Sequence, residues 1–216
     1  MFENVDGSDV AIKDLVTVGS PVGAAAYGTS DQIWGWNTES ATWTKYYYYS
    51  GRQGKKWIKT TDAATATETE DTLATGKTFF FCRASSATGA TTLTLSGKVK
   101  ALDGESSFTV SAGQLAFASN PWPIAMDVKD ISNYYTSGTP VGAAAYGTSD
   151  QIWLWDTAAA GWTKYYYYSG RQGKKWIKTT DGANVTETTD AIPSGAGFFF
   201  QRASSATAAA TITFTK

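Results

Sequence analysis

The sequence has no histidine among its 216 residues and a single cysteine, Cys82. Without histidine the chain cannot form a Ser-His-Asp or Cys-His catalytic site, and it lacks the usual nitrogen ligand of zinc. One thiol cannot form a disulfide within one chain. We therefore expect Cys82 to be a small buried or half-buried residue without a reactive role.

Charged residues are also scarce, at 17% of the sequence against roughly 25% in an average soluble domain. A net charge of −1 provides no strongly basic surface, so we expect no nucleic-acid partner. No apolar run approaches the roughly 18 to 20 residues of a membrane-spanning helix, so we expect no membrane insertion.

The first residues, Met1–Leu15, have neither a basic start nor an apolar stretch, and we do not expect them to be a signal peptide. A chain of this kind is either kept inside a cell or virion, or is the mature or trimmed form of an exported protein.

Aromatic residues, by contrast, are abundant: nine Trp, twelve Tyr and ten Phe make up 14% of the chain. Many of them lie in a long internal repeat. The segment Pro21–Gly97 aligns with Pro140–Lys216 without a gap, and about 55 of the 77 aligned residues are identical. The chain is thus built from one unit used twice, so any site within the unit should occur twice.

Short segments rich in aromatic and β-branched residues, separated by Gly, Ser and Asp, are typical of strands in an all-β fold. They alternate with turns every eight to twelve residues, which predicts two homologous antiparallel units, sandwich-like or barrel-like, in tandem. The expected strands in the first unit are Asp31–Asn37, Trp43–Tyr49, Lys55–Thr61, Thr78–Ala84 and Thr91–Val99. Short helical turns are expected at Asp9–Leu15 and Ala125–Ile131.

The predicted units are residues 1–97 and 120–216, and the segment between them, 98–119, occurs only once. Its Asp103-Gly104 turn and the alternation in Ser106–Phe117 predict a hairpin, in which Ser106–Phe117 pairs with Thr92–Leu102. This hairpin is either an insertion or a strand that the first unit lacks. In the second case a neighbouring unit or chain would fill the gap.

No cofactor, nucleotide or metal motif is present, and we expect no catalytic residues and no enzyme activity. GRQGKK lacks the Ser or Thr and the strand–loop–helix setting of a phosphate-binding loop. Four acids are matched between the copies, and we interpret those in the loop after Asp62 as solvated. They are Asp31, Asp62, Glu68 and Asp71, with Asp150, Asp181, Glu187 and Asp190.

The hairpin KYYYYSGRQGKKWIK is the best candidate for an interaction surface. Ile58 and two tyrosines would face the core, and the other face would display aromatic and cationic side chains together. Such a face suits a protein contact or a glycan, although it could also only stabilise the hairpin. The candidate residues are Lys45, Tyr47, Tyr49, Arg52, Lys55, Trp57 and Lys59, with Lys164, Tyr166, Tyr168, Arg171, Lys174, Trp176 and Lys178 in the second copy.

Two further aromatic patterns concern the core. Trp34 and Trp36 share one strand face, which favours core packing over a sugar-binding platform. The residue between them is Gly35 in one copy and Leu154 in the other, a size change that predicts a solvent-facing position. The run Phe79–Phe81 places aromatics on both sides of its strand, so either one ring is exposed or both faces are covered.

Four short motifs stand out along the chain: Asn120-Pro121-Trp122-Pro123, Gln32-Ile33-Trp34, Gly195-Ala196-Gly197-Phe198-Phe199-Phe200 and Thr92–Val99. They resemble motifs of uncharacterised secreted bacterial proteins made of tandem aromatic β-repeats. The resemblance covers most of the second unit. The first unit departs from the pattern, because it has Met1-Phe2 in place of Asn-Pro. It implies an extracellular or cell-surface setting and no known activity.

From these features we predict a non-enzymatic structural or surface protein that self-assembles, as an oligomer or filament, through aromatic faces and open β edges. The alternative is a glycan-binding adhesion module that uses the Trp, Tyr, Lys and Arg side chains of the hairpin.

Overall fold

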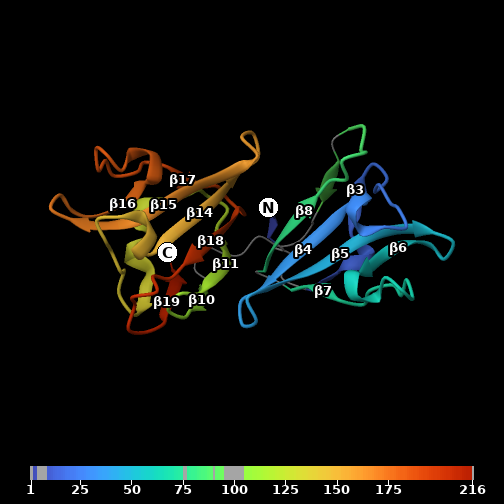
Figure 1. Cartoon of the computed structure of the whole chain (residues 1–216), viewed down its shortest axis with the longest axis horizontal. Coiled ribbons are helices and arrows are strands. Elements are labelled where there is room, and N and C mark those ends of the chain that lie inside the picture. The colour runs from blue at the N-terminus through green and yellow to red at the C-terminus, as the bar shows by residue number, and fades with distance from the viewer. Residues whose placement is uncertain (1, 4–8, 75–76, 90, 95–104, 216) are drawn as a thin grey trace. The chain divides into compact units, whose positions relative to one another are not determined.

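In a computed structural model the chain forms two compact units, residues 1–99 and 100–216 (Figure 1). The structure describes residues 2–3, 9–74, 77–89, 91–94 and 105–215. The all-β prediction is confirmed, since antiparallel strands dominate and the described helical segments are 3-10 turns of three to seven residues. Both units use one sheet order, β1-β8-β4-β5-β6 in the first and β11-β18-β14-β15-β16 in the second.

The first unit is built around this five-stranded sheet and two short strand pairs. The sheet strands are β1 (Phe2–Glu3), β4 (Gln32–Asn37), β5 (Thr42–Gly51), β6 (Gly54–Lys59) and β8 (Thr78–Cys82). The pairs are β2 (Val10–Ala11) with β7 (Thr72–Leu73), and β3 (Val16–Val18) with β9 (Thr92–Thr94). The 3-10 turns are η1 (Ile12–Asp14), η2 (Tyr27–Thr29) and η3 (Thr60–Asp62).

The second unit has the same sheet and a larger second layer. The sheet strands are β11 (Leu115–Ser119), β14 (Gln151–Asp156), β15 (Gly161–Gly170), β16 (Gly173–Lys178) and β18 (Gly197–Gln201). The second layer contains β10 (Ser106–Val110), β13 (Tyr135–Ser137) and β19 (Ala210–Phe214), and β12 (Met126–Asp127) pairs with β17 (Ala191–Ile192). The 3-10 turns are η4 (Val128–Tyr134), η5 (Tyr146–Thr148) and η6 (Thr179–Asp181).

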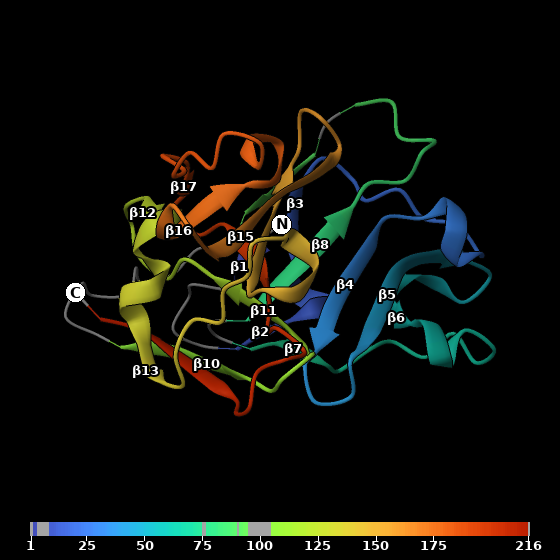
Figure 2. The same cartoon turned by 60° about the vertical axis from the view of Figure 1, so that its left-hand side comes forward.

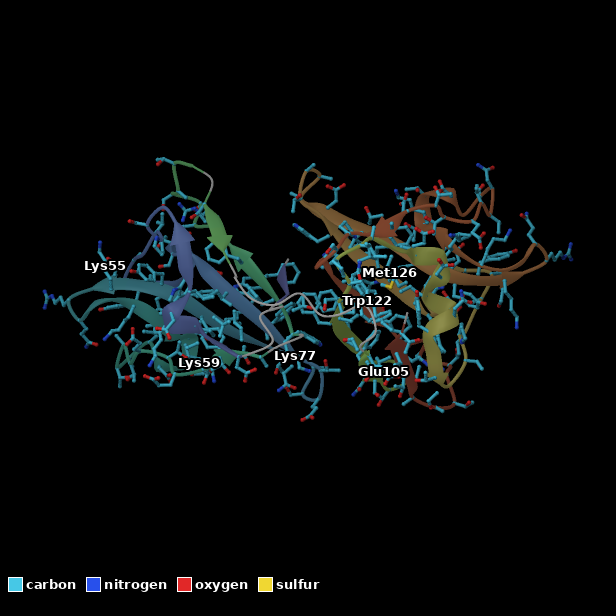
Figure 3. The ribbon with its side chains drawn as sticks, turned by 180° about the vertical axis from the view of Figure 1, so that it is seen from behind. Lys55, Lys59, Lys77, Glu105, Trp122 and Met126 are labelled. Atoms are coloured by element: carbon cyan, nitrogen blue, oxygen red, sulfur yellow. The ribbon has the colours of Figure 1, made fainter. Side chains whose placement is uncertain are left out.

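The core of the second unit lies between its two layers, as in a β-sandwich. Ile152 and Phe200 from the five-stranded sheet pack with Ile212 and Phe214 from β19. Trp122, just before β12, is buried in the same core, together with the neighbouring Met126 (Figure 3). The first unit has a smaller core of the same kind.

The single-copy segment pairs entirely within the second unit over its described part. Strand β10 pairs with β19 at five positions, and β11 pairs with β18 at five (Figure 2). The predicted pairing with Thr92–Leu102 is therefore wrong for Ser106–Val110, while residues 95–104 lie outside the described part. The actual partner, Ala210–Phe214, is the repeat counterpart of 91–95, and the pairing buries Val110 in the sandwich core.

The first unit uses the start of the chain at the position of β11. Strand β1 pairs with β8 at two positions, Phe2 with Phe79 and Glu3 with Thr78. The predicted hairpin between β5 and β6 is present with a tighter connection than expected, because Gly51 pairs with Gly54. Gly54 has a φ of +93°, a conformation that other residues rarely adopt and that closes this turn.

Candidate functional site

The interaction surface predicted on the β5–β6 hairpin is divided between the two sides of the sheet. Tyr47 pairs directly with Ile58. Directly paired residues point to the same side, and so do residues two apart on a strand. The side of Ile58 carries Lys45, Tyr47 and Tyr49, and the opposite side carries Lys55, Trp57 and Lys59. The second unit has the same register, so the single face that the sequence predicts does not form in either unit.

Burial also removes most of the predicted rings from the surface. The buried rings are Tyr47, Trp57, Tyr166, Tyr168 and Trp176. Trp57 packs edge-to-face on Tyr48 at 5.4 Å in the main core of the first unit, and such a large ring is worth more inside than in water. Arg52 and Lys55, with Arg171 and Lys174, remain exposed at the hairpin tips; Figure 3 shows Lys55 at the tip of the first hairpin.

The structure gathers a different set of aromatic side chains on one side of each sheet. In the first unit Trp43 lies at the centre of this aromatic face. Its ring is 5.9 Å from Trp34, 5.0 Å from Trp36 and 5.6 Å from Phe80, all in edge-to-face contact. All four side chains are half-buried. They lie opposite the main core, because the neighbouring Ile33 points into that core.

The second unit repeats this aromatic face and extends it by one ring. Trp162 lies 6.2 Å from Trp153, 5.1 Å from Trp155 and 5.4 Å from Phe199. Phe117 of β11 stacks on Phe199 at 4.5 Å. Phe198, Phe199 and Phe200 are all buried, so both faces of this strand are covered, one of the two outcomes that the sequence allowed.

The prediction for the residue between the paired tryptophans is wrong. Leu154 packs against the core of the second unit, and Trp153 and Trp155 therefore point to the other side. Gly35 occupies the corresponding position in the first unit, and an added Cβ there would meet nothing within 4 Å. The position tolerates a size change because it has space on the core side of the sheet, where both residues are half-buried.

One lysine in each unit belongs to the aromatic face. Lys45 Nζ lies 4.2 Å from the centroid of the Trp34 ring, and Lys164 has the same distance to Trp153. The indole of Trp34 also donates to Gln32 Oε1 at 2.8 Å. A cation over an indole ring is attracted to its π-electrons, so this contact fixes the ring and covers one of its faces.

A buried carboxylate anchors each unit at the residue just before β4 or β14. In the second unit Asp150 is fully buried, and its Oδ1 accepts from the backbone N–H of Ala203 at 2.8 Å. Its Oδ2 accepts from Tyr135 Oη at 2.8 Å, Val141 N at 3.0 Å and Arg202 Nη1 at 2.5 Å. Burial and the nearby Asp150 charge raise the pKa of Tyr135 well above its ordinary value.

The first unit has the same anchor with a more exposed cation. Asp31 accepts from the backbone N–H groups of Val22 at 2.9 Å and Ala84 at 2.8 Å, and from the Arg83 guanidinium. The Arg83 side chain is 27% exposed, against 2% for Arg202. A buried charge needs several hydrogen-bond donors. Asp31 and Asp150 each have them, and this gives both carboxylates a structural role.

A second carboxylate binds two side chains beside the core. Asp190 Oδ2 accepts from Tyr165 Oη at 2.7 Å and from Lys178 Nζ at 3.0 Å. The pKa of Asp190 is lowered, chiefly by the Tyr165 hydrogen bond, while burial raises the pKa of Tyr165. The first unit repeats both distances in its own Tyr–Asp–Lys cluster, formed by Tyr46, Asp71 and Lys59.

The sequence predicts that Asp71 and Asp190 lie in a solvated loop. This prediction is wrong, because both carboxylates accept hydrogen bonds from side chains of the hairpin. The available signal was that these acids are matched in a region where the copies otherwise differ. The sequence favours core packing for Trp34 and Trp36, and this prediction is wrong, because both are half-buried on the side of the sheet opposite the main core. The contribution of Trp43 to the aromatic face depends on strand register, which local sequence does not give.

Within the described residues no cluster of three or more acidic or Cys side chains could hold a metal ion. No helix in that part of the chain has the length and apolar character needed to cross a bilayer. No known family model, curated protein or solved structure matches this chain.

Proposed function

We propose that this chain is a non-enzymatic structural protein that self-assembles through the aromatic faces of its two units. The observation that carries the proposal is a cluster of three half-buried tryptophans and a phenylalanine, built in the same way on both sheets; the phenylalanine is half-buried in the first unit and buried in the second. Large aromatic side chains on a surface poor in charge are the residues that dominate protein–protein binding energy.

The proposed partner is a second copy of the chain. The described aromatic face includes no acidic residue, and its lysine, Lys45 or Lys164, already lies over a tryptophan ring. Complementarity between two such faces is therefore apolar rather than ionic. Each chain carries the face twice, and weak single contacts add up through multivalency wherever both copies take part.

Strand edges have less support as the assembly contact than aromatic faces. The outer strand β6 carries Lys55, Lys56 and Lys59, and Ile58 on it forms a β-bridge with Glu68. Lysines on an edge strand oppose strand addition, because pairing would bring charges together and desolvate them. We therefore place the association on the sheet faces.

The glycan-binding alternative on the hairpin is also less well supported. It requires Tyr47 and Trp57 on one accessible face, whereas both are buried and on opposite sides of the sheet. A platform at Trp34 would have to displace Lys45 from the ring.

The test compares two double variants in sedimentation velocity over a concentration series. In Trp36→Lys/Trp155→Lys a charge enters each aromatic face, and in Arg52→Ala/Arg171→Ala the exposed hairpin tips change instead. We expect association of the wild type and the arginine variant, and loss of association in the tryptophan variant. Circular dichroism checks that both variants are folded.

Salt dependence provides a second criterion. Apolar association strengthens in sulfate, whereas association through the basic hairpin tips would weaken as salt screens the charges. A salt-weakened association that is lost in the arginine variant would contradict the proposal.

A further inference from the structure

The second unit has an open cavity of about 380 Å³ beside its Tyr–Asp–Lys cluster. Its lining residues come from β14 and β15, the end of β16 and the start of β17. Leu154 pairs with Thr163, and Tyr165 pairs with Lys178. Residues two apart on a strand point to the same side, so strand register places these side chains on one side of the sheet.

Two carboxylates at this cavity are held in place and keep an acceptor atom available. Asp190 Oδ2 is occupied by Tyr165 and Lys178, while Asp190 Oδ1 has no hydrogen bond within the described part of the chain. Asp156 Oδ1 accepts from the backbone N–H groups of Ala158 at 2.9 Å and Ala159 at 3.0 Å. Its Oδ2 is likewise without a partner among the described residues.

The lining therefore combines fixed oxygen acceptors with hydroxyl groups and apolar surface. Thr163 contributes a hydroxyl, and Lys178 has two further N–H donors beyond the one given to Asp190. Leu154 contributes apolar surface to the lining, and Ala191 adds to it. The charges of Asp156, Asp190 and Lys178 sum to −1, which disfavours phosphate, sulfate and uronate groups.

We propose that this cavity is a binding site for a neutral saccharide. Sugar hydroxyls donate to preorganised carboxylate oxygens, and hydrogen bonds to charged acceptors are about twice as strong as neutral ones. The C–H faces of a sugar ring suit the apolar side of the lining. The site is independent of the self-assembly proposed above, because it uses the Tyr–Asp–Lys side of the sheet.

The first unit provides an internal comparison for this site. It keeps the cluster of Tyr46, Asp71 and Lys59, but has Asn37 in place of Asp156 and Gly35 in place of Leu154. Asn37 Oδ1 accepts from Ser40 N at 3.0 Å, so an amide supports the same turn. Asp156→Asn therefore changes the charge of the acceptor while it preserves the local backbone.

The experiment is a ¹⁵N–¹H NMR titration of the full chain with cellobiose, N,N′-diacetylchitobiose and methyl α-mannopyranoside at millimolar concentration. We expect at least one of these sugars to shift the signals of Thr163 and Trp155. Asp156→Asn should weaken that binding by about tenfold, as expected for loss of a hydrogen bond to a charged group. Glucuronic acid serves as the anionic control and should leave these signals unchanged.

Three outcomes would overturn the site: no shift at Thr163 or Trp155 with any of the three sugars, equal affinity in Asp156→Asn, or shifts confined to Arg171 and Lys174. Each would leave the self-assembly proposal intact, since that depends on the tryptophan variants in sedimentation. Conversely, binding at Thr163 in a strictly monomeric protein would support the site and contradict only self-assembly.

Discussion

At the scale of single residues, the two copies work as matched controls for each other. The anchors Asp31 and Asp150 have the same backbone partners but different exposure of their arginine. The sequence showed only that both acids recur. Their burial could not be predicted, because it depends on Arg83 and Arg202, which lie 52 residues further along the chain.

Asp150→Ala is expected to destabilise its unit by about 3 to 5 kcal/mol, because it leaves the buried Arg202 without a counter-charge. Asp31→Ala should cost less, about 2 kcal/mol, since Arg83 can turn towards water. Hydrogen-exchange mass spectrometry in urea measures each unit separately through peptides of β8 and β18, whose sequences differ. An equal or larger loss in Asp31→Ala would contradict this interpretation.

The side chain of Tyr168 lies so close to Gly170 that it leaves no room for a Cβ there. A Cβ added at Gly170 would lie 2.1 Å from the Tyr168 hydroxyl. Gly170→Ala must therefore displace a buried ring, which we expect to cost about 1 to 3 kcal/mol. Gly147→Ala is the control, since its Cβ would meet nothing within 4 Å. Thermal unfolding should separate the two variants, and similar melting temperatures would refute the role of this contact.

At the scale of elements, strand pattern and turn residues were sufficient to predict most of the sheet. The aromatic and β-branched runs became β4, β5, β6 and β8, and the Asp9–Leu15 segment formed a 3-10 turn at Ile12–Asp14. Alternation along a strand does not determine which side faces the core, and the hairpin surface was wrong for this reason. Side assignment follows from pairing with distant strands, which local sequence does not specify.

The Tyr–Asp–Lys clusters attach β7 and β17 to the hairpins, and they predict an acid-sensitive fold. A lowered pKa means that Asp71 and Asp190 stabilise the fold fully above their ordinary value of 3.8 and lose this contribution as the pH falls through their lowered pKa. The urea concentration at the unfolding midpoint should therefore decrease as the pH is lowered from about 5 to about 2.5.

The matched variant for this prediction is Asp71→Asn/Asp190→Asn. It should lower stability at neutral pH by about 1 kcal/mol per site, since the carboxylates are partly exposed. Its dependence on pH below about 4 should be shallower than that of the wild type. An unchanged slope would assign the acid sensitivity to other carboxylates.

The second unit requires β10 and β11, because these strands pair with β19 and β18. A fragment of residues 105–216 should fold cooperatively, whereas residues 120–216 should not, because the loss of Val110 and Ala116 opens the sandwich core. Circular dichroism melting of the two fragments measures this difference. A cooperative transition in the shorter fragment would show that the hairpin is dispensable.

At the scale of the whole molecule, duplication gives each chain two aromatic faces. One face per chain permits only a pair of chains, whereas two permit continued growth. The sequence indicated two copies of an aromatic region through its repeat and its aromatic content. The location of the contact could not be predicted, because Trp43 and Phe80 join the Trp34–Trp36 pair only through strand register.

The most direct test of the central claim is sedimentation velocity of the wild type, the single variants Trp36→Lys and Trp155→Lys, and the double variant, each over a concentration series. We predict assemblies larger than dimers for the wild type, no species beyond a dimer for either single variant, and monomers for the double variant. A wild type that stays monomeric at the highest concentration, or a double variant that assembles as the wild type does, would contradict self-assembly through the aromatic faces.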